Sequence, residues 1–364
     1  MVTTVIRGAP AGAPTGMVYV VDVNHPRVIS ATPVFETRWA WAAANPRGGH
    51  RGARGIATVD GRIAIANADE IHVFDRAWQR TAVLSDRAVG DIHELCATPE
   101  GVWACSTRSD EVVHLGWDGH VRDRWSWRED AALVRRFGYR SVAPVDDRVD
   151  YRVLRAVNVE ATDLGHVNGV IATNEGLLVS LGRVRLPSPS ARERAAAFAG
   201  AVARAALVGR PVSRRLRADR LRRFGADPQP GARRRGLIAL VRPGRAAQVL
   251  SDRPLPGWSN HNQLVHGSEL VLCDTGAGAV VAVDRDSSAE RQAPIPQPSC
   301  FLRGLAWLGD DRFLAGTRRP AALWVADLST GRAERALTLS GEQRESVHDI
   351  EPLPDAWDDP PSRL

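Results

Sequence analysis

The sequence predicts an all-β fold, a six-bladed β-propeller, on three observations. A pattern of four short strands recurs along the chain. The same position of each copy carries a small residue. Strand-like segments near the N-terminus belong to no copy, and they can complete a last copy that begins close to the C-terminus.

The repeat is clearest after His93, where four apolar segments are separated by turns. The strand ELCAT is followed by the turn PEG, the strand VWACST by RSD, and the strand EVVHLGW by DGH, before a last strand VRDRWSW. Four antiparallel strands in about 40 residues are the unit of a propeller blade. Further copies begin at Arg54, Asn168, His261 and Arg303.

The alignment of the copies can be checked by comparing the residue that stands twelve positions after the first residue of each copy. It is small in each case, at Ala66, Cys105, Ser180, Cys273 and Ala315. Neighbouring sheets of a propeller crowd together at their second strands, where small side chains fit best. This column therefore supports the repeat, and it gives two of the four cysteines a structural role.

A sixth copy begins at His348, close to the end of the chain. Its remaining strands can come from the N-terminal segments MVYVVDV and RVISATPVFE, which are strand-like and otherwise unassigned. The first and last segments then share one blade, which closes the ring. We therefore expect residues 1–364 to form a single propeller domain.

Two insertions lengthen the chain around the third blade, at 128–160 and 186–235. Residues 183–235 hold fifteen Arg against three acidic residues, a local charge of +12. Ser190 and Glu193 form a capping-box pattern, which predicts a helix in the second insertion. Both insertions are expected on the face where the innermost strands start, as a lid or as a surface for a protein or peptide partner. The alternative is that the basic insertion is a solvated surface segment with neither role.

Nucleic acid is a weaker hypothesis for the basic insertion. It lacks interleaved aromatic residues apart from Phe198 and Phe224, and the rest of the chain is acidic. Contact of a basic helix with a membrane surface stays open.

Composition excludes several kinds of chemistry. All 48 basic residues are arginine, so a Schiff base, a pyridoxal-phosphate anchor and a P-loop lysine are excluded. The four cysteines form no CxxC pair, which argues against a zinc ribbon and a disulfide framework. No run approaches the roughly 20 apolar residues of a membrane span, and the first residues lack the apolar core of a signal peptide. We therefore expect a cytoplasmic protein.

The first residues of the six copies are all polar or charged: Arg54, His93, Asn168, His261, Arg303 and His348. In a ring of blades these positions face the mouth of the central channel. His166 shortly precedes the third of them, and the flanking polar residues are Asp91, Glu94, Asn260, Asn262 and Asp349. The sequence thus predicts a polar funnel on the axis, and converging polar groups in a concave site usually bind a ligand.

The imidazoles make this funnel a candidate metal site. His93, His261 and His348 are expected to bind a divalent metal, with zinc or iron foremost and manganese or copper as alternatives. His166 is expected to be a fourth ligand or the general base.

The arginines and asparagines suit the binding of a substrate. Arg54 and Arg303 are expected to clamp an anionic group and to take part in catalysis, because a guanidinium fork matches a carboxylate or phosphate. Asn168 and Asn262 are expected to contact the substrate. Two alternatives remain open: His and Arg bind an anion without a metal, with one His as general base, or the channel is a hydrated hole.

Five segments carry a resemblance to known proteins: DIHEL, GHVNGV, NHNQL, FLRGLAW and VHDIEPLP. With them the chain resembles uncharacterised bacterial propeller proteins that have an H-x-N, H-N-P and F-x-R-G-L succession, although Gln263 stands where the middle motif has Pro. More distantly it is similar to the superfamily of gluconolactonases and strictosidine-synthase-like proteins, whose sites usually bind a hard cation through carboxylate and Asn ligands. The site alone resembles that of the peptidyl-hydroxyglycine amidating lyase, which implies zinc on the three ligand histidines.

These observations predict a metal-dependent enzyme of the lyase, hydrolase or oxygenase type, acting on a small anionic or carbonyl-bearing metabolite in the funnel. The alternative is a non-catalytic propeller that binds a protein or peptide partner through the funnel face and the 186–235 insertion.

Overall fold

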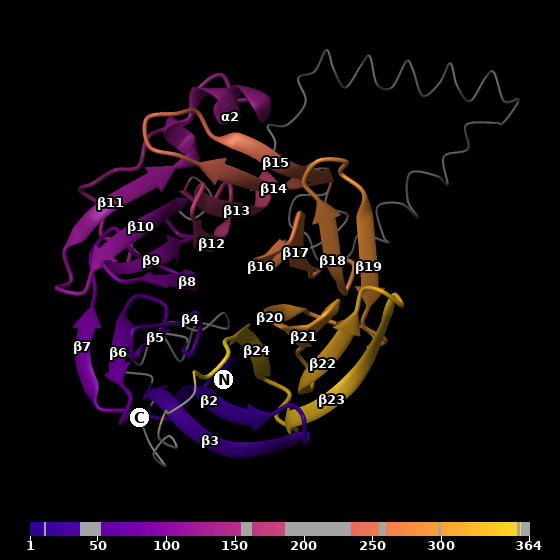
Figure 1. Cartoon of the computed structure of the whole chain (residues 1–364). Helices are drawn as coiled ribbons and strands as arrows, with labels where there is room; N and C mark the ends of the chain where they lie inside the picture. The colour runs from indigo at the N-terminus through magenta and orange to yellow at the C-terminus, as the bar shows by residue number, and fades with distance from the viewer. Residues whose placement is uncertain are drawn as a thin grey trace, which may run out of the picture.

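The computed structural model shows six sheets arranged around a central axis (Figure 1). It describes residues 1–10, 12–36, 52–153, 162–185, 234–254, 260–297, 300–354 and 357. Within these ranges every sheet has four strands, and neighbouring strands are antiparallel. The predicted six-bladed β-propeller is confirmed.

The first-named strand of each blade lies nearest the axis, and the other three follow outward (Figure 1). Blade 1 consists of β4 (Ile56–Val59), β5 (Arg62–Ala66), β6 (Ile71–Asp75) and β7 (Arg80–Leu84). Blade 2 consists of β8 (Ile92–Thr98), β9 (Gly101–Ser106), β10 (Glu111–Gly116) and β11 (Val121–Ser126). Blade 3 consists of β12 (Val167–Thr173), β13 (Gly176–Arg185), β14 (Arg234–Val241) and β15 (Gln248–Pro254).

The second half of the ring follows the same plan. Blade 4 consists of β16 (Asn260–His266), β17 (Glu269–Asp274), β18 (Ala279–Asp284) and β19 (Glu290–Pro294). Blade 5 consists of β20 (Arg303–Gly309), β21 (Arg312–Gly316), β22 (Ala321–Asp327) and β23 (Arg332–Ser340). Blade 6 consists of β24 (Glu345–Ile350), β1 (Val2–Ile6), β2 (Pro14–Asp22) and β3 (Arg27–Glu36).

Blade 6 joins the two ends of the chain, as predicted. The C-terminal strand β24 pairs with β1, with Val2 opposite Ile350. The two N-terminal segments expected from the sequence are β2 and β3. Strand β1 was not predicted from the sequence, because a five-residue run with two threonines is too short to show a strand period.

The blades pack on one another through their second strands. Ala66, Cys105, Cys273 and Ala315 are fully buried there, and Ser180 is 4% exposed. One apolar cluster joins two blades by bringing Cys105 of blade 2 together with residues of blade 3 such as Val179 and Leu237. The small residues therefore let adjacent sheets approach closely, as the repeat predicted.

The first insertion begins with short helical turns outside the blades. These are the 3₁₀ turn η1 (Trp127–Glu129) and the helix α2 (Ala131–Arg136), whose first amides are capped by Asp130. No helix within the described ranges has the length and apolar character needed to cross a membrane.

The second insertion lies almost entirely outside the described residues, which resume at residue 234. Arg234 and Arg235, assigned to the insertion from the sequence, belong to strand β14. The helix expected in this insertion, and the role of the insertion as a lid or partner surface, stay predictions.

Closure of the ring can be tested at Gly316, where a methyl group would overlap the Cβ and Cγ1 atoms of Val347 on β24. Because a valine side chain has few alternative rotamers, Gly316→Ala should lower the free energy of unfolding by about 1–3 kcal/mol. Urea unfolding measures this change. Gly341→Ala is the matched control, since nothing lies within 4 Å of its Cβ position. A Gly316→Ala midpoint equal to that of the wild type contradicts the packing of β24 against blade 5.

Candidate functional site

Irregularities in the innermost strands aim the predicted residues at the axis. The pairing register shifts between Ile92 and Leu95 in β8, on either side of His93, and between Val167 and Gly169 in β12. Similar shifts occur in β16, β20 and at the β24–β1 pair. A bulge leaves a residue unpaired and bends its strand, so these side chains leave the regular alternation between sheet faces.

The segment before β12 is held by a carboxylate of the neighbouring blade. Asp110 is fully buried and accepts hydrogen bonds from the amides of Leu164 at 2.7 Å, Gly165 at 2.9 Å and His166 at 2.9 Å. His166 has a left-handed backbone with φ of 54°. Asp110 thus fixes a turn that an ordinary residue rarely adopts, and this turn carries the His166 ring into the funnel.

Three imidazoles converge as a group that suits a metal ion. One nitrogen atom each of His93, His166 and His261 lies within 4.8 Å of the others. The ring centroids are 5.0 Å apart for His93 and His166, 6.1 Å for His166 and His261, and 6.2 Å for His93 and His261. His348 lies outside this group, although its ring centroid is 5.6 Å from that of His93.

The hydrogen bonds of His93 determine its tautomer. Its Nδ1 lies 2.8 Å from the carbonyl oxygen of Asp91 and 2.8 Å from the hydroxyl of Thr107. A carbonyl oxygen only accepts, so Nδ1 carries the hydrogen. The Thr107 hydroxyl donates its own hydrogen to the carbonyl of Val167 at 2.6 Å. The lone pair of His93 is therefore on Nε2.

His261 is oriented in the same way on another blade. The Thr275 hydroxyl donates to the carbonyl of Leu302 at 2.7 Å, so it accepts from Nδ1 of His261 at 2.8 Å. Nδ1 of His166 lies 3.1 Å from Asp163, and a carboxylate is the usual outer partner of a metal-binding histidine.

None of these three orienting residues was predicted from the sequence. A signal for two of them was present, because Thr107 and Thr275 both stand fourteen residues after the first residue of their copy. Asp163 had no such signal. Its contact with His166 depends on the fold of the preceding loop, which the repeat does not encode.

Arg303 lies between two imidazoles. Its Nη1 donates to Nε2 of His348 at 2.5 Å, and its Nη2 donates to Nε2 of His261 at 2.7 Å. Both rings therefore accept at Nε2, and His348 Nδ1 is buried without a hydrogen-bond partner among the described residues. Arg303, which the sequence predicted to bind an anion, thus occupies the Nε2 lone pair of His261 that a metal ion would need.

Burial keeps three of the imidazoles neutral. It lowers the pKa of His93, His261 and His348 well below the usual value, and the positive charge of Arg303 lowers each pKa further. Neutral imidazole is the form that binds a metal or accepts a hydrogen bond.

The other predicted residues are tied into the wall of the funnel. Arg54 lies 2.7 Å from the Asp91 carboxylate and donates to the carbonyl of Ile92 at 2.7 Å. Asn168 donates to the carbonyl of Asn260 in the next blade at 2.5 Å. These contacts give both side chains a structural role, and their contact with a substrate stays a prediction.

Two buried carboxyl groups lie next to the ligand candidates in sequence. Burial raises the pKa of Asp349 to about 8 and raises that of Glu94 well above its usual value, with the charge of Asp349 adding to the effect on Glu94. Asn262 donates to Asp349 at 2.8 Å and accepts from the amide of Gly304 at 2.7 Å. Both ends of the Asn262 amide are thus used within the wall.

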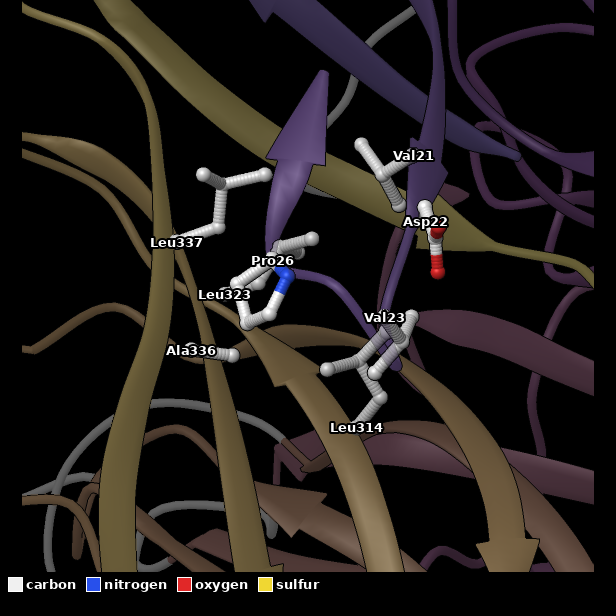
Figure 2. A pocket seen from close by; sticks show the side chains of 8 residues that line it. All are labelled: Val21, Asp22, Val23, Pro26, Leu314, Leu323, Ala336 and Leu337. Carbon is white, nitrogen blue, oxygen red and sulfur yellow. The ribbon is translucent and has the colours of Figure 1, made fainter. Parts of the chain in front are cut away.

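A separate apolar recess lies between blades 5 and 6, where the β2–β3 turn meets the outer strands (Figure 2). Its lining consists of Val21, Asp22, Val23, Pro26, Leu314, Leu323, Ala336 and Leu337. The single carboxylate, Asp22, accepts hydrogen bonds from the amides of Asn24 and His25 in its own turn. This recess offers packing and no group for chemistry, so the funnel is the candidate site.

Comparison with known proteins identifies the fold alone. No protein-family profile matches this sequence, and no curated protein matches it. A protein of unknown function from Bacteroides caccae is 10% identical, with 96% of this chain and 97% of that chain covered and a TM-score of 0.50. A chain of a nidogen/laminin complex is 8% identical, with coverages of 95% and 97% and a TM-score of 0.51. The fold and site define a six-bladed propeller with a histidine-lined funnel. The resemblance of its motifs to those of uncharacterised bacterial propeller proteins stays a prediction.

The role of the threonines can be tested at Thr275. Thr275→Val removes the acceptor for His261 Nδ1 and the donor to Leu302, so the free energy of unfolding should fall by about 1–3 kcal/mol. Imidazole nitrogen NMR should show the Nδ1–H tautomer of His261 in the wild type and a changed signal in the variant. Thr275→Ser keeps the hydroxyl and serves as the control. Equal stability of the Val and Ser variants contradicts this role.

Proposed function

We propose that this protein is an enzyme that holds a divalent metal ion on His93, His166 and His261. The observation that carries the proposal is the convergence of three ring nitrogens, one from each residue, within 4.8 Å. The three rings come from blade 2, from blade 4 and from the loop that leads into blade 3, and each has its Nδ1 bound to an oxygen. Such outer partners orient the ring and direct the other nitrogen to a metal.

The donor set favours zinc or iron, with manganese or copper as alternatives, because neutral imidazole binds all four ions. Three protein ligands leave coordination positions for water and substrate. When bound, the ion supplies Lewis-acid chemistry, which polarises a carbonyl group or lowers the pKa of a water molecule.

The remaining residues of the funnel would bind and orient the substrate. Arg303 would turn from His261 toward an anionic or carbonyl oxygen, and Arg54 would keep Asp91 and the start of β8 in place. His348, which accepts from Arg303 at 2.5 Å, would orient that guanidinium rather than bind the ion as the sequence predicted. We propose a lyase, hydrolase or oxygenase reaction on a small anionic or carbonyl-bearing metabolite.

Elemental analysis tests the metal site directly. Plasma mass spectrometry on protein purified without a His-tag or chelator should find close to one equivalent of zinc, iron, manganese or copper. His93→Ala, His166→Ala and His261→Ala should each lose the metal while circular dichroism still shows a folded chain. His348→Ala should keep it, because that ring lies outside the group of three.

The control is His25→Ala, since the His25 side chain is 83% exposed in a turn on the outside of blade 6. Full metal occupancy in a folded His261→Ala protein would rule out the ligand assignment. A native protein without metal, even after incubation with each of the four ions, would rule out the metal-dependent function.

Arg303 provides a second test with a defined direction. Arg303→Met removes a positive charge and frees Nε2 of His261, so Co²⁺ should bind at least about tenfold more tightly, which corresponds to roughly 1.4 kcal/mol. Visible absorption of the Co²⁺ protein measures the affinity. Arg122→Met, on the exposed outer strand β11, is the control. Weaker Co²⁺ binding by Arg303→Met contradicts the competition between Arg303 and the metal.

A further inference from the structure

Three arginines lie on loops of blades 5 and 6 beside the funnel, and we name Arg7, Arg318 and Arg319 the rim arginines. Arg7 directly follows β1, and the other two lie between β21 and β22. The amide of Arg7 donates to the carbonyl of Arg344 at 3.0 Å, and Arg318 forms an isolated β-bridge with Ser346. The two loops are thus fastened to the same segment, which leads into the innermost strand β24.

Among the residues that the structure describes, Arg7 and Arg318 have no anionic partner of their own. In the described part of the chain, no ion pair or hydrogen bond involves the guanidinium of Arg7 or Arg318, and the Nε atoms of both are buried without a partner. Burial lowers the pKa of Arg7 to about 10, and the positive charges of Arg318 and Arg54 add to this effect. Asp91 is the carboxylate that acts on Arg7, and it is already bound to Arg54 at 2.7 Å.

This concentration of positive charge is unfavourable unless a counter-charge is supplied. Arg7 and Arg318 are half-buried, and the part of a guanidinium that has left water needs an anion or hydrogen-bond acceptors to recover its solvation. The protein supplies neither to Arg7 and Arg318 within the ranges described. A bound anion would satisfy both, and a guanidinium fork can hold a carboxylate or a phosphate through two parallel hydrogen bonds.

Phe301 connects the rim arginines with the histidines. The guanidinium carbon of Arg7 lies 5.6 Å from the centroid of the Phe301 ring, and that of Arg303 lies 5.1 Å from it. The Phe301 ring centroid is 5.7 Å from that of His261. A group bound by Arg7 is therefore one aromatic ring away from the His261 imidazole.

We propose that Arg7 and Arg318, with Arg319 at the exposed edge, bind a second anionic group of the compound on which the funnel acts. The substrate is then a small molecule with two ionised groups, each a carboxylate or a phosphate, joined by a short apolar part that lies along Phe301. This inference rests on the proposed function for the reacting centre, and it adds the class of substrate. The positive rim would also attract such a molecule before it binds.

Binding of simple anions tests the site. Inorganic phosphate and succinate are titrated separately into the whole protein at constant ionic strength, with sodium chloride as the reference, and calorimetry and the thermal midpoint are recorded. Either anion should bind and raise the midpoint, because a ligand of the folded state stabilises it. The stronger of the two identifies phosphate or carboxylate as the preferred group. Arg7→Gln and Arg318→Gln should each weaken binding at least tenfold.

The variants should fold, since each loses a charge that forms no ion pair within the described residues. Without added anion their thermal midpoints should equal or exceed that of the wild type, whereas a merely structural role would lower them. Arg122→Gln is the control, because Arg122 is exposed on β11 and pairs with Asp118. Its anion affinity should equal that of the wild type.

Two results would overturn the inference. One is a folded wild type whose midpoint responds to phosphate and succinate no more than to chloride. The other is unchanged anion affinity in both Gln variants. Metal analysis of the same samples separates this inference from the proposed function: anion binding that depends on Arg7 in a protein that never holds metal would refute the metal-dependent function and leave the rim site standing.

Discussion

The pairing of the last strand with the first is the constraint on which the structure depends. A single four-stranded sheet leaves both faces and both edges exposed, and a ring of sheets buries the faces only when it is complete. In this ring Val2 pairs with Ile350, and the amino group of Met1 donates to the carbonyl of Glu351 at 2.6 Å. The funnel exists because this closure brings all six innermost strands to one axis.

The funnel brings together more basic groups than one would expect a protein interior to hold. Burial keeps three imidazoles neutral, and Arg54 is paired with Asp91. Arg303 directs two of its nitrogens at the lone pairs of His261 and His348. Each arrangement reduces the cost of placing a basic group away from water. The same reasoning explains why the rim arginines point to an anionic compound.

The threonines show how the repeat couples stability to the site. Thr107 and Thr275 each form a hydrogen bond with a histidine of their own blade. Each also donates to a backbone carbonyl at the innermost strand of the next blade, Thr107 to Val167 and Thr275 to Leu302. One hydroxyl therefore fixes both the spacing of two blades and the tautomer of a ring. Chemistry at the axis and cohesion of the ring depend on the same hydrogen bonds.

Much of this protein could be predicted from its sequence. The period of the strands and the column of small residues determined the blades and how they align, and the two end segments indicated the closure, because these follow from local spacing. His348, expected as the first residue of its copy, is instead the fourth residue of β24. Only the tertiary structure decided that His166 joins His93 and His261, that His348 falls outside their group of ring nitrogens, and that Arg303 lies between the rings of His261 and His348. Those contacts link blades that are far apart in sequence, and bulges and left-handed residues such as His166 aim the side chains. A pattern of alternating strands does not encode such departures from its own regularity.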